Sequence, residues 1–121
     1  MPHPFADLIG MEVTTGEQGH AVSRLTIGPD HMNPHGVVHG AVLFALIDTS
    51  MGGAAVSILD EGQRPATIEV QVRFLRPALA GELMCETTVV KPGRRVVHLE
   101  SRVTDAAGKL VATGTGSFAV L

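Results

Sequence analysis

The feature that most constrains the fold of this chain is an apolar segment, residues 31–59, that carries a single formal charge. That charge is Asp48, and its position at the middle of the segment isolates it from every Lys, Arg, Glu and other Asp. Residues 38–59 contain no proline and are apolar nearly all round, which predicts a helix enclosed by protein. Burying an isolated carboxylate is costly, so we expect Asp48 to be neutralised or to have a specific partner.

The same segment also raises the alternative of a transmembrane helix, because it is long enough to span a bilayer. Asp48 at its centre, the internal glycines Gly52 and Gly53, and the lack of Lys and Arg at its flanks argue against that alternative. We therefore expect no membrane span, and a single domain over residues 1–121.

Composition removes several classes of function. The net charge is −3, and there is no Trp or Tyr and only four Phe, so we expect no nucleic-acid partner. The single Cys85 excludes an internal disulfide, and it is compatible with the reducing cytoplasm, where we expect the protein to act. No secretory signal is visible at the N-terminus. Cys85 lies within a predicted strand with no catalytic partner suggested nearby, so we expect it in the core.

The rest of the chain predicts an α+β fold with a mainly antiparallel sheet. Residues 3–10 can form a short helix that ends at Gly10. Alternating apolar and polar residues, broken by Pro and Gly, predict strands, with Ile68, Val70, Val72 and Phe74 on one half-buried face. The expected strands are 20–27, 67–74, 83–91, 95–105 and 110–120.

A sheet of about five to six strands covers only one face of the long helix. Because the helix is apolar nearly all round, its uncovered face predicts a partner. The simplest partner is a second copy of this chain, and we expect a homodimer that assembles further into a homotetramer as a dimer of dimers.

The loop before the helix and the helix itself carry a spaced motif: Asn33, Gly36, His39, Gly40 and Asp48. This motif resembles that of the hotdog-fold acyl-CoA thioesterases, in particular the phenylacetate-pathway thioesterase family. The likeness continues through residues 67–77 and 91–95, and so covers essentially the whole chain. Ala41 is the departure, since a second glycine of the family motif would stand there. The resemblance implies a hotdog fold, in which the sheet wraps around one long central helix.

The resemblance also implies roles for individual residues. Gly40 lies at the predicted helix N-terminus, where free amides and the helix dipole favour negative charge, and it resembles the family's oxyanion donor. Asp48 resembles the catalytic carboxylate, acting as a general base on water or as a direct nucleophile. Close packing of Gly40, and a partnered buried acid at Asp48, are the structural alternatives.

Three further residues match positions near that centre. His39 could hold substrate or orient Asn33, or it could serve only the helix start. Asn33 could position the attacking water or Asp48, or it could form the turn before Pro34. Thr67 matches a hydroxyl that orients the attacking water in some family members, although Thr is also an ordinary strand residue.

Three cations, Lys91, Arg94 and Arg95, lie within five residues that contain no acid. Such a cluster could hold the phosphates of a nucleotide arm, or it could be a solvated turn. Metal binding by His31, His35 and His39 is the weaker alternative use of those histidines, because Pro34 and Gly36 break the helix on which they would align. We therefore expect no metal.

Taken with the resemblance, these residues predict a hydrolase of small acyl- or aryl-CoA thioesters that needs no cofactor, with coenzyme A entering as part of the substrate. Two alternatives are a non-catalytic acyl-CoA-binding module and a hydratase or dehydratase of the same fold. Asp48 favours a catalytic protein over a binder, and the spacing of Asn33, Gly40 and Asp48 favours hydrolysis over hydration.

Overall fold

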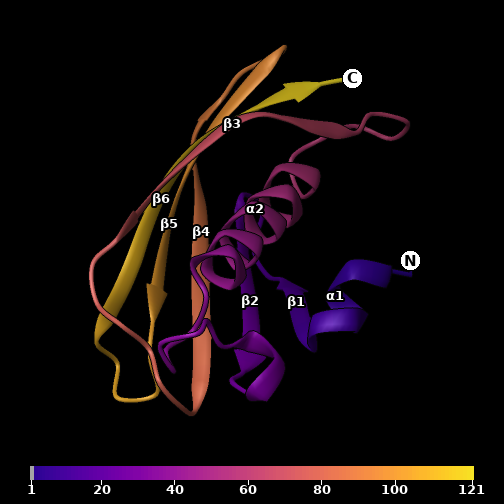
Figure 1. Ribbon diagram of the computed structural model, residues 1–121. Coiled ribbons are helices and arrows are strands. Elements are labelled where there is room, and N and C mark those ends of the chain that lie inside the picture. The colour runs from indigo at the N-terminus through magenta and orange to yellow at the C-terminus, as the bar shows by residue number, and fades with distance from the viewer. Residues whose placement is uncertain (1) are drawn as a thin grey trace.

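The computed structural model describes residues 2–121, and the order of its elements agrees closely with the expected one. A short helix and two strands precede a long helix, and four strands follow it (Figure 1). The elements are α1 (Pro4–Ile9), β1 (Met11–Thr15), β2 (His20–Thr26), the 3-10 helix η1 (Pro29–His31), α2 (Gly40–Val56), β3 (Pro65–Phe74), β4 (Glu82–Pro92), β5 (Val96–Thr104) and β6 (Leu110–Val120).

The six strands form one sheet in the order β1-β2-β4-β5-β6-β3, and every neighbouring pair is antiparallel. The sheet curves along one side of α2, and α1 lies beside the β1 margin (Figure 1). This is the hotdog arrangement, an antiparallel sheet wrapped around one long helix, and the expected fold class is therefore confirmed.

The first and third strands depart from the sequence-based expectation. β1, a five-residue strand between Gly10 and Gly16, was not predicted. β3 does not pair with the strand that follows it but crosses to the far edge beside β6, where a bulge leaves Ile68 without a cross-strand partner. Ile68 and Phe74 are consequently each 57% exposed, so the half-buried face expected for this strand holds only at Val70 and Val72.

Close contact between α2 and the sheet depends on two glycines in β6. A Cβ atom built at Gly114 would lie 2.8 Å from Cγ2 of Ile47, and one at Gly116 would lie 2.5 Å from Sδ of Met51. Ile47 and Met51 are fully buried, because each occupies the space that a missing side chain leaves. The strand glycines thus let the helix approach the sheet backbone closely.

Polar side chains also hold α2 against β2. The hydroxyl of Ser23 in β2 donates a hydrogen bond to the carbonyl oxygen of Leu46, at 3.0 Å. In the opposite direction, the hydroxyl of Ser50 in α2 donates to the carbonyl oxygen of Ala21, at 3.3 Å. Both serines are fully buried. Each hydroxyl finds its hydrogen-bond acceptor in the backbone of the other element.

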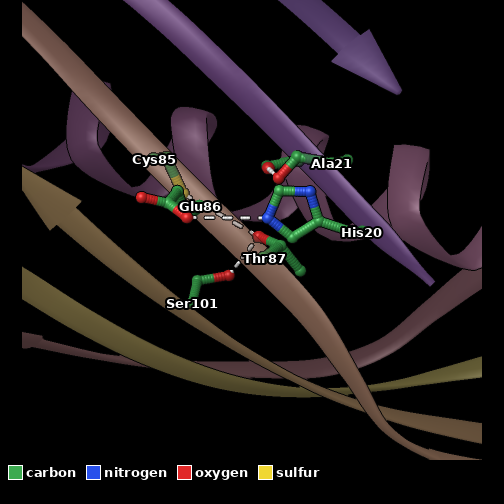
Figure 2. A network of polar contacts seen from close by, with 7 residues as sticks. His20, Ala21, Cys85, Glu86, Thr87 and Ser101 are labelled. Carbon is green, nitrogen blue, oxygen red and sulfur yellow. Dashed lines mark hydrogen bonds and ion pairs between the residues drawn. The ribbon is translucent and has the colours of Figure 1, made fainter. Parts of the chain in front are cut away.

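Cys85 lies in the core beside these serines, as expected. Figure 2 shows the Thr87 hydroxyl between the Cys85 thiol and the hydroxyl of Ser101, with Thr87 hydrogen-bonded to Ser101. The thiol is fully buried, and burial raises its pKa. A protonated, enclosed thiol is a poor nucleophile, so Cys85 serves packing.

Within residues 2–121, no helix combines the length and the apolar character needed to cross a membrane.

Candidate active site

The side of α2 that faces away from the sheet forms the floor of an open groove of about 650 Å³. The floor is made by Ala41, Phe44, Asp48, Gly52 and Val56, which recur every three or four residues and so share one face of the helix. One wall comes from α1 and β1, and the other from β3 and β6. We call this feature the α2 groove.

Asp48 occupies the middle of this floor. Its side chain is only partly buried within this chain. The reason is that the sheet wraps one face of α2 and leaves the Asp48 face open. The expected partner is present, because the Thr67 hydroxyl in β3 donates a hydrogen bond to Oδ1 of Asp48 at 2.8 Å.

The Thr67 bond has a chemical consequence for the carboxylate. It occupies Oδ1 and fixes the plane of the group, while Oδ2 has no hydrogen-bond partner among residues 2–121. Of the described residues that line the α2 groove, only Asp48 and His3 are titratable. The groove therefore presents one oriented carboxylate in mostly apolar surroundings.

The N-terminus of α2 presents one free amide. His39 is the N-cap, and its ring Nδ1 accepts a hydrogen bond from the amide of Ala41 at 2.9 Å. The amide of Val42 donates to the carbonyl oxygen of His39, also at 2.9 Å. The amide of Gly40 has no acceptor among residues 2–121, so it is the helix-end donor available to a ligand.

Asn33 and His39 are brought near the helix end but not near Asp48. Oδ1 of Asn33 accepts hydrogen bonds from the amides of His35 at 2.8 Å and Val37 at 3.3 Å, which closes the loop before α2. Within residues 2–121, no side-chain hydrogen bond joins Asn33 to His39 or to Asp48. Within one chain, the geometry shows both residues shaping the helix start.

The cations of the turn between β4 and β5 lie at the other end of α2. Arg94 and Arg95 border a cleft with Asp60 and Gln63, which follow the C-terminus of the helix. Lys91 precedes the turn on β4, and all three cations are exposed. The 17 residues of α2 span about 25 Å, so in one chain the cations are far from Gly40.

The structure thus joins Asp48 to Thr67 and gathers Asn33, His39 and Gly40 at the start of α2. Lys91, Arg94 and Arg95 lie at the other end of the helix. Eight helical residues place Gly40 and Asp48 about 12 Å apart along α2, which is too far for both to act on one carbonyl group. Two copies of α2 packed antiparallel would bring the Gly40 end of one helix toward Asp48 of the other.

Several groove residues were not predicted from the sequence. Val13 on β1 and Phe118 on β6 line the walls, and they come from distant parts of the chain. Gly52, one helical turn after Asp48, is part of the floor. The sequence did indicate this position, since residues 41, 44, 48, 52 and 56 follow helical spacing and two of them are Ala or Gly.

Known proteins resemble this chain along nearly its whole length. Residues 35–112 match the family model described as the thioesterase superfamily. A protein of Saccharolobus solfataricus, provisionally named an esterase, is 30% identical over 93% of this chain and 80% of its own length. The acyl-coenzyme A thioesterase PaaI of Escherichia coli is 28% identical over 92% of this chain and 78% of its own length. The solved structure of the conserved protein PA5202 from Pseudomonas aeruginosa has a TM-score of 0.94 at 34% identity, covering 100% of this chain and 96% of the other.

Proposed function

The chain belongs to the thioesterase superfamily and is a thioester hydrolase, and from this premise we propose that it cleaves small acyl- or aryl-CoA thioesters to the free acid and coenzyme A. The observation that carries the proposal is the hydrogen bond between Asp48 on the floor and Thr67 in the wall of a mostly apolar groove. The apolar walls suit an acyl group, and the oriented carboxylate suits attack on its carbonyl carbon.

Asp48 performs the attack in one of two ways. As a general base, it accepts a proton from water through Oδ2 while the water oxygen bonds to the carbonyl carbon. As a nucleophile, it bonds to that carbon itself, and water then hydrolyses the mixed anhydride. In both cases the carbon–sulfur bond breaks with its electron pair going to sulfur, and the thiolate of coenzyme A takes up the proton released by the attacking water. Thr67 holds the carboxylate in position throughout.

The negative charge that develops on the carbonyl oxygen needs a donor. The free amide of Gly40, at the positive end of the α2 dipole, is suited to that role. Because Gly40 and Asp48 are about 12 Å apart in one chain, we propose that each site takes Gly40 from one protomer and Asp48 from its partner. The protein would then act as a homodimer, and we extend the proposal to a dimer of dimers in the cytoplasm.

Complementation between two inactive chains tests the shared site. Asp48→Ala lacks the carboxylate, and Gly40→Pro lacks the amide hydrogen. A hybrid dimer of the two contains one complete site if the sites are shared, so it should recover about half of the wild-type activity per dimer. The measurement is thiol release by hybrids purified through two different tags. Inactive hybrids, with intact dimers, would place each site within one chain.

The CoA phosphates should meet the turn between β4 and β5. In antiparallel dimers, Arg94 and Arg95 of one protomer lie toward the Gly40 end of its partner. Replacing both arginines with Ala should raise KM for a CoA thioester by about tenfold or more, because charge-assisted hydrogen bonds to phosphate are lost. Turnover of a phosphate-free N-acetylcysteamine thioester should change little. Arg102→Ala, in the same sheet but outside the turn, is the matched control. Equal losses on both substrates would assign the turn a structural role.

The products of a CoA thioester panel separate the proposed hydrolase from its alternatives. Hydrolysis releases a free thiol, hydration of an unsaturated acyl group gives a hydroxyacyl-CoA, and a binding module releases neither. Thiol release from at least one acyl- or aryl-CoA is the expected result. Binding of the thioesters without any product would identify a binding module.

A further inference from the structure

Gly52 has no side chain at the point where the α2 groove passes Asp48. It lies on the helix face of Asp48, one turn further along, about 6 Å away along the axis. A Cβ atom built at Gly52 would meet only Cε2 of Phe118, at 4.0 Å, which is ordinary van der Waals contact. Within the described chain, an alanine would therefore fit at this position.

Its neighbour Gly53 differs in this respect. A Cβ atom there would lie 3.3 Å from Cβ of Ala21 and 3.4 Å from Cγ1 of Val13. Glycine at position 53 is thus explained by the close approach of α2 to β1 and β2. Packing within the chain gives no such explanation for Gly52.

The absence of a packing reason matters because glycine inside a helix is unfavourable. Gly is less favourable than Ala in a helix interior, because it loses more backbone freedom when the helix forms. Gly52 stands within α2, one turn before its C-terminal residue Val56, and its φ is not in the left-handed region. Gly52 therefore leaves space open beside Asp48 that packing within the described chain does not require.

We infer that Gly52 is a specificity-determining residue, and that the space over it seats the bulk of the acyl group. The inference rests on the proposed thioester hydrolysis and adds the class of acyl group. Because Gly52 is only one turn from Asp48, the site accepts acyl groups with a ring or branch close to the thioester carbonyl. Phe44 in the floor and Phe118 in the wall provide the apolar surface for that bulk.

Substitution of Gly52 by Ala and by Val tests the inference, with benzoyl-CoA and acetyl-CoA as substrates. The ratio of kcat/KM for benzoyl-CoA to that for acetyl-CoA should fall about tenfold or more with Ala, and further with Val. Activity on acetyl-CoA should stay within a few-fold of wild type, since Asp48 and Thr67 are untouched. Gly52→Ala should also keep or raise Tm.

Gly53→Ala is the matched control, because it makes the same replacement one residue later. It should lower Tm and leave the substrate ratio unchanged. The inference is overturned if Gly52→Ala leaves the ratio unchanged, if it lowers activity on both substrates equally, or if it dissociates the oligomer. The last outcome would make Gly52 a contact between helices of two protomers.

A binding measurement distinguishes failure of this inference from failure of the proposed function. In the Asp48→Asn background, the dissociation constants of benzoyl-CoA and acetyl-CoA report on the acyl space without turnover. The ratio of those constants should shift against benzoyl-CoA when Gly52 becomes Ala or Val. If the ratio shifts but the wild-type chain hydrolyses neither thioester, the proposed function is contradicted and the inference about Gly52 stands.

Discussion

Replacing Asp48 with Asn should lower kcat on the best CoA thioester by about 10²–10⁴-fold, the range expected for loss of a general base. Asn keeps the shape of the side chain, and its carbonyl oxygen can still accept the hydrogen bond from Thr67. It cannot take a proton from water or attack as an anion. KM and the unfolding midpoint should therefore change little, and steady-state kinetics with a thermal melt measure all three quantities.

Asp30→Asn is the control for that experiment, since it removes the same charge from an exposed position on η1. It should leave kcat unchanged. A folded Asp48→Asn chain with wild-type turnover would make Asp48 a structural residue. If turnover does depend on Asp48, single-turnover hydrolysis in ¹⁸O-water separates the two roles. Label in the Asp48 carboxylate indicates a nucleophile, and unlabelled Asp48 indicates a general base.

Replacing Gly40 with Pro should lower kcat by about 10²–10³-fold, the usual loss when one oxyanion donor is removed. Proline has no amide hydrogen, yet it is well tolerated at the first position of a helix. His39 before it has φ −62° and ψ 136°, an extended conformation that a following proline accepts. The helix should therefore form normally while the free amide is lost.

Gly40→Ala separates the loss of the amide from the effect of an added side chain. Both substitutions add a Cβ atom, which would lie 3.2 Å from the ring of Phe74. That ring is 57% exposed and can move aside. Gly40→Ala should accordingly keep most of the activity. Equal kcat values for the Ala and Pro variants, both folded, would show that the Gly40 amide does not stabilise the transition state.

Periodicity in the sequence predicted the helices and strands that pack against the core along their whole length. The long helix and the strands at 83–91, 95–105 and 110–120 lie within a few residues of their predicted limits. Each has a repeated apolar face against a single core. β1 escaped prediction because it is a short edge strand in which only Met11 is fully buried.

Sheet order could not be predicted, because alternation identifies a strand but not its neighbour. β3 lies at the far edge beside β6, so only part of its apolar face meets the core, and Ile68 and Phe74 are left exposed. The sheet leaves the Asp48 face of α2 open, as the expectation that one sheet covers only one face of the helix predicted. An apolar helix predicts that something covers each face, but the pattern does not show whether the cover belongs to the same chain.

The candidate site was partly readable from the sequence. The lone charge identified Asp48, and the resemblance identified Thr67, whose hydrogen bond to Asp48 the structure shows. The walls formed by Val13 and Phe118 could not be predicted, because these two residues come together only in the folded chain. For Asn33, the sequence left two alternatives, a role in positioning water or Asp48 and a role in forming the turn before Pro34. The structure shows hydrogen bonds of the second kind.

The paired serine contacts between α2 and β2 have a consequence for how the chain selects one native state. A helix that is apolar nearly all round has little hydrophobic preference for which side it turns to the sheet. Turning α2 by one residue, about 100°, would leave the Ser23 and Ser50 hydroxyls buried without acceptors, at about 1–3 kcal/mol each. The two hydrogen bonds therefore favour one rotational position of α2 about its own axis. They act from the buried side, opposite the carboxylate, and the angle they select is the one that presents Asp48 to Thr67.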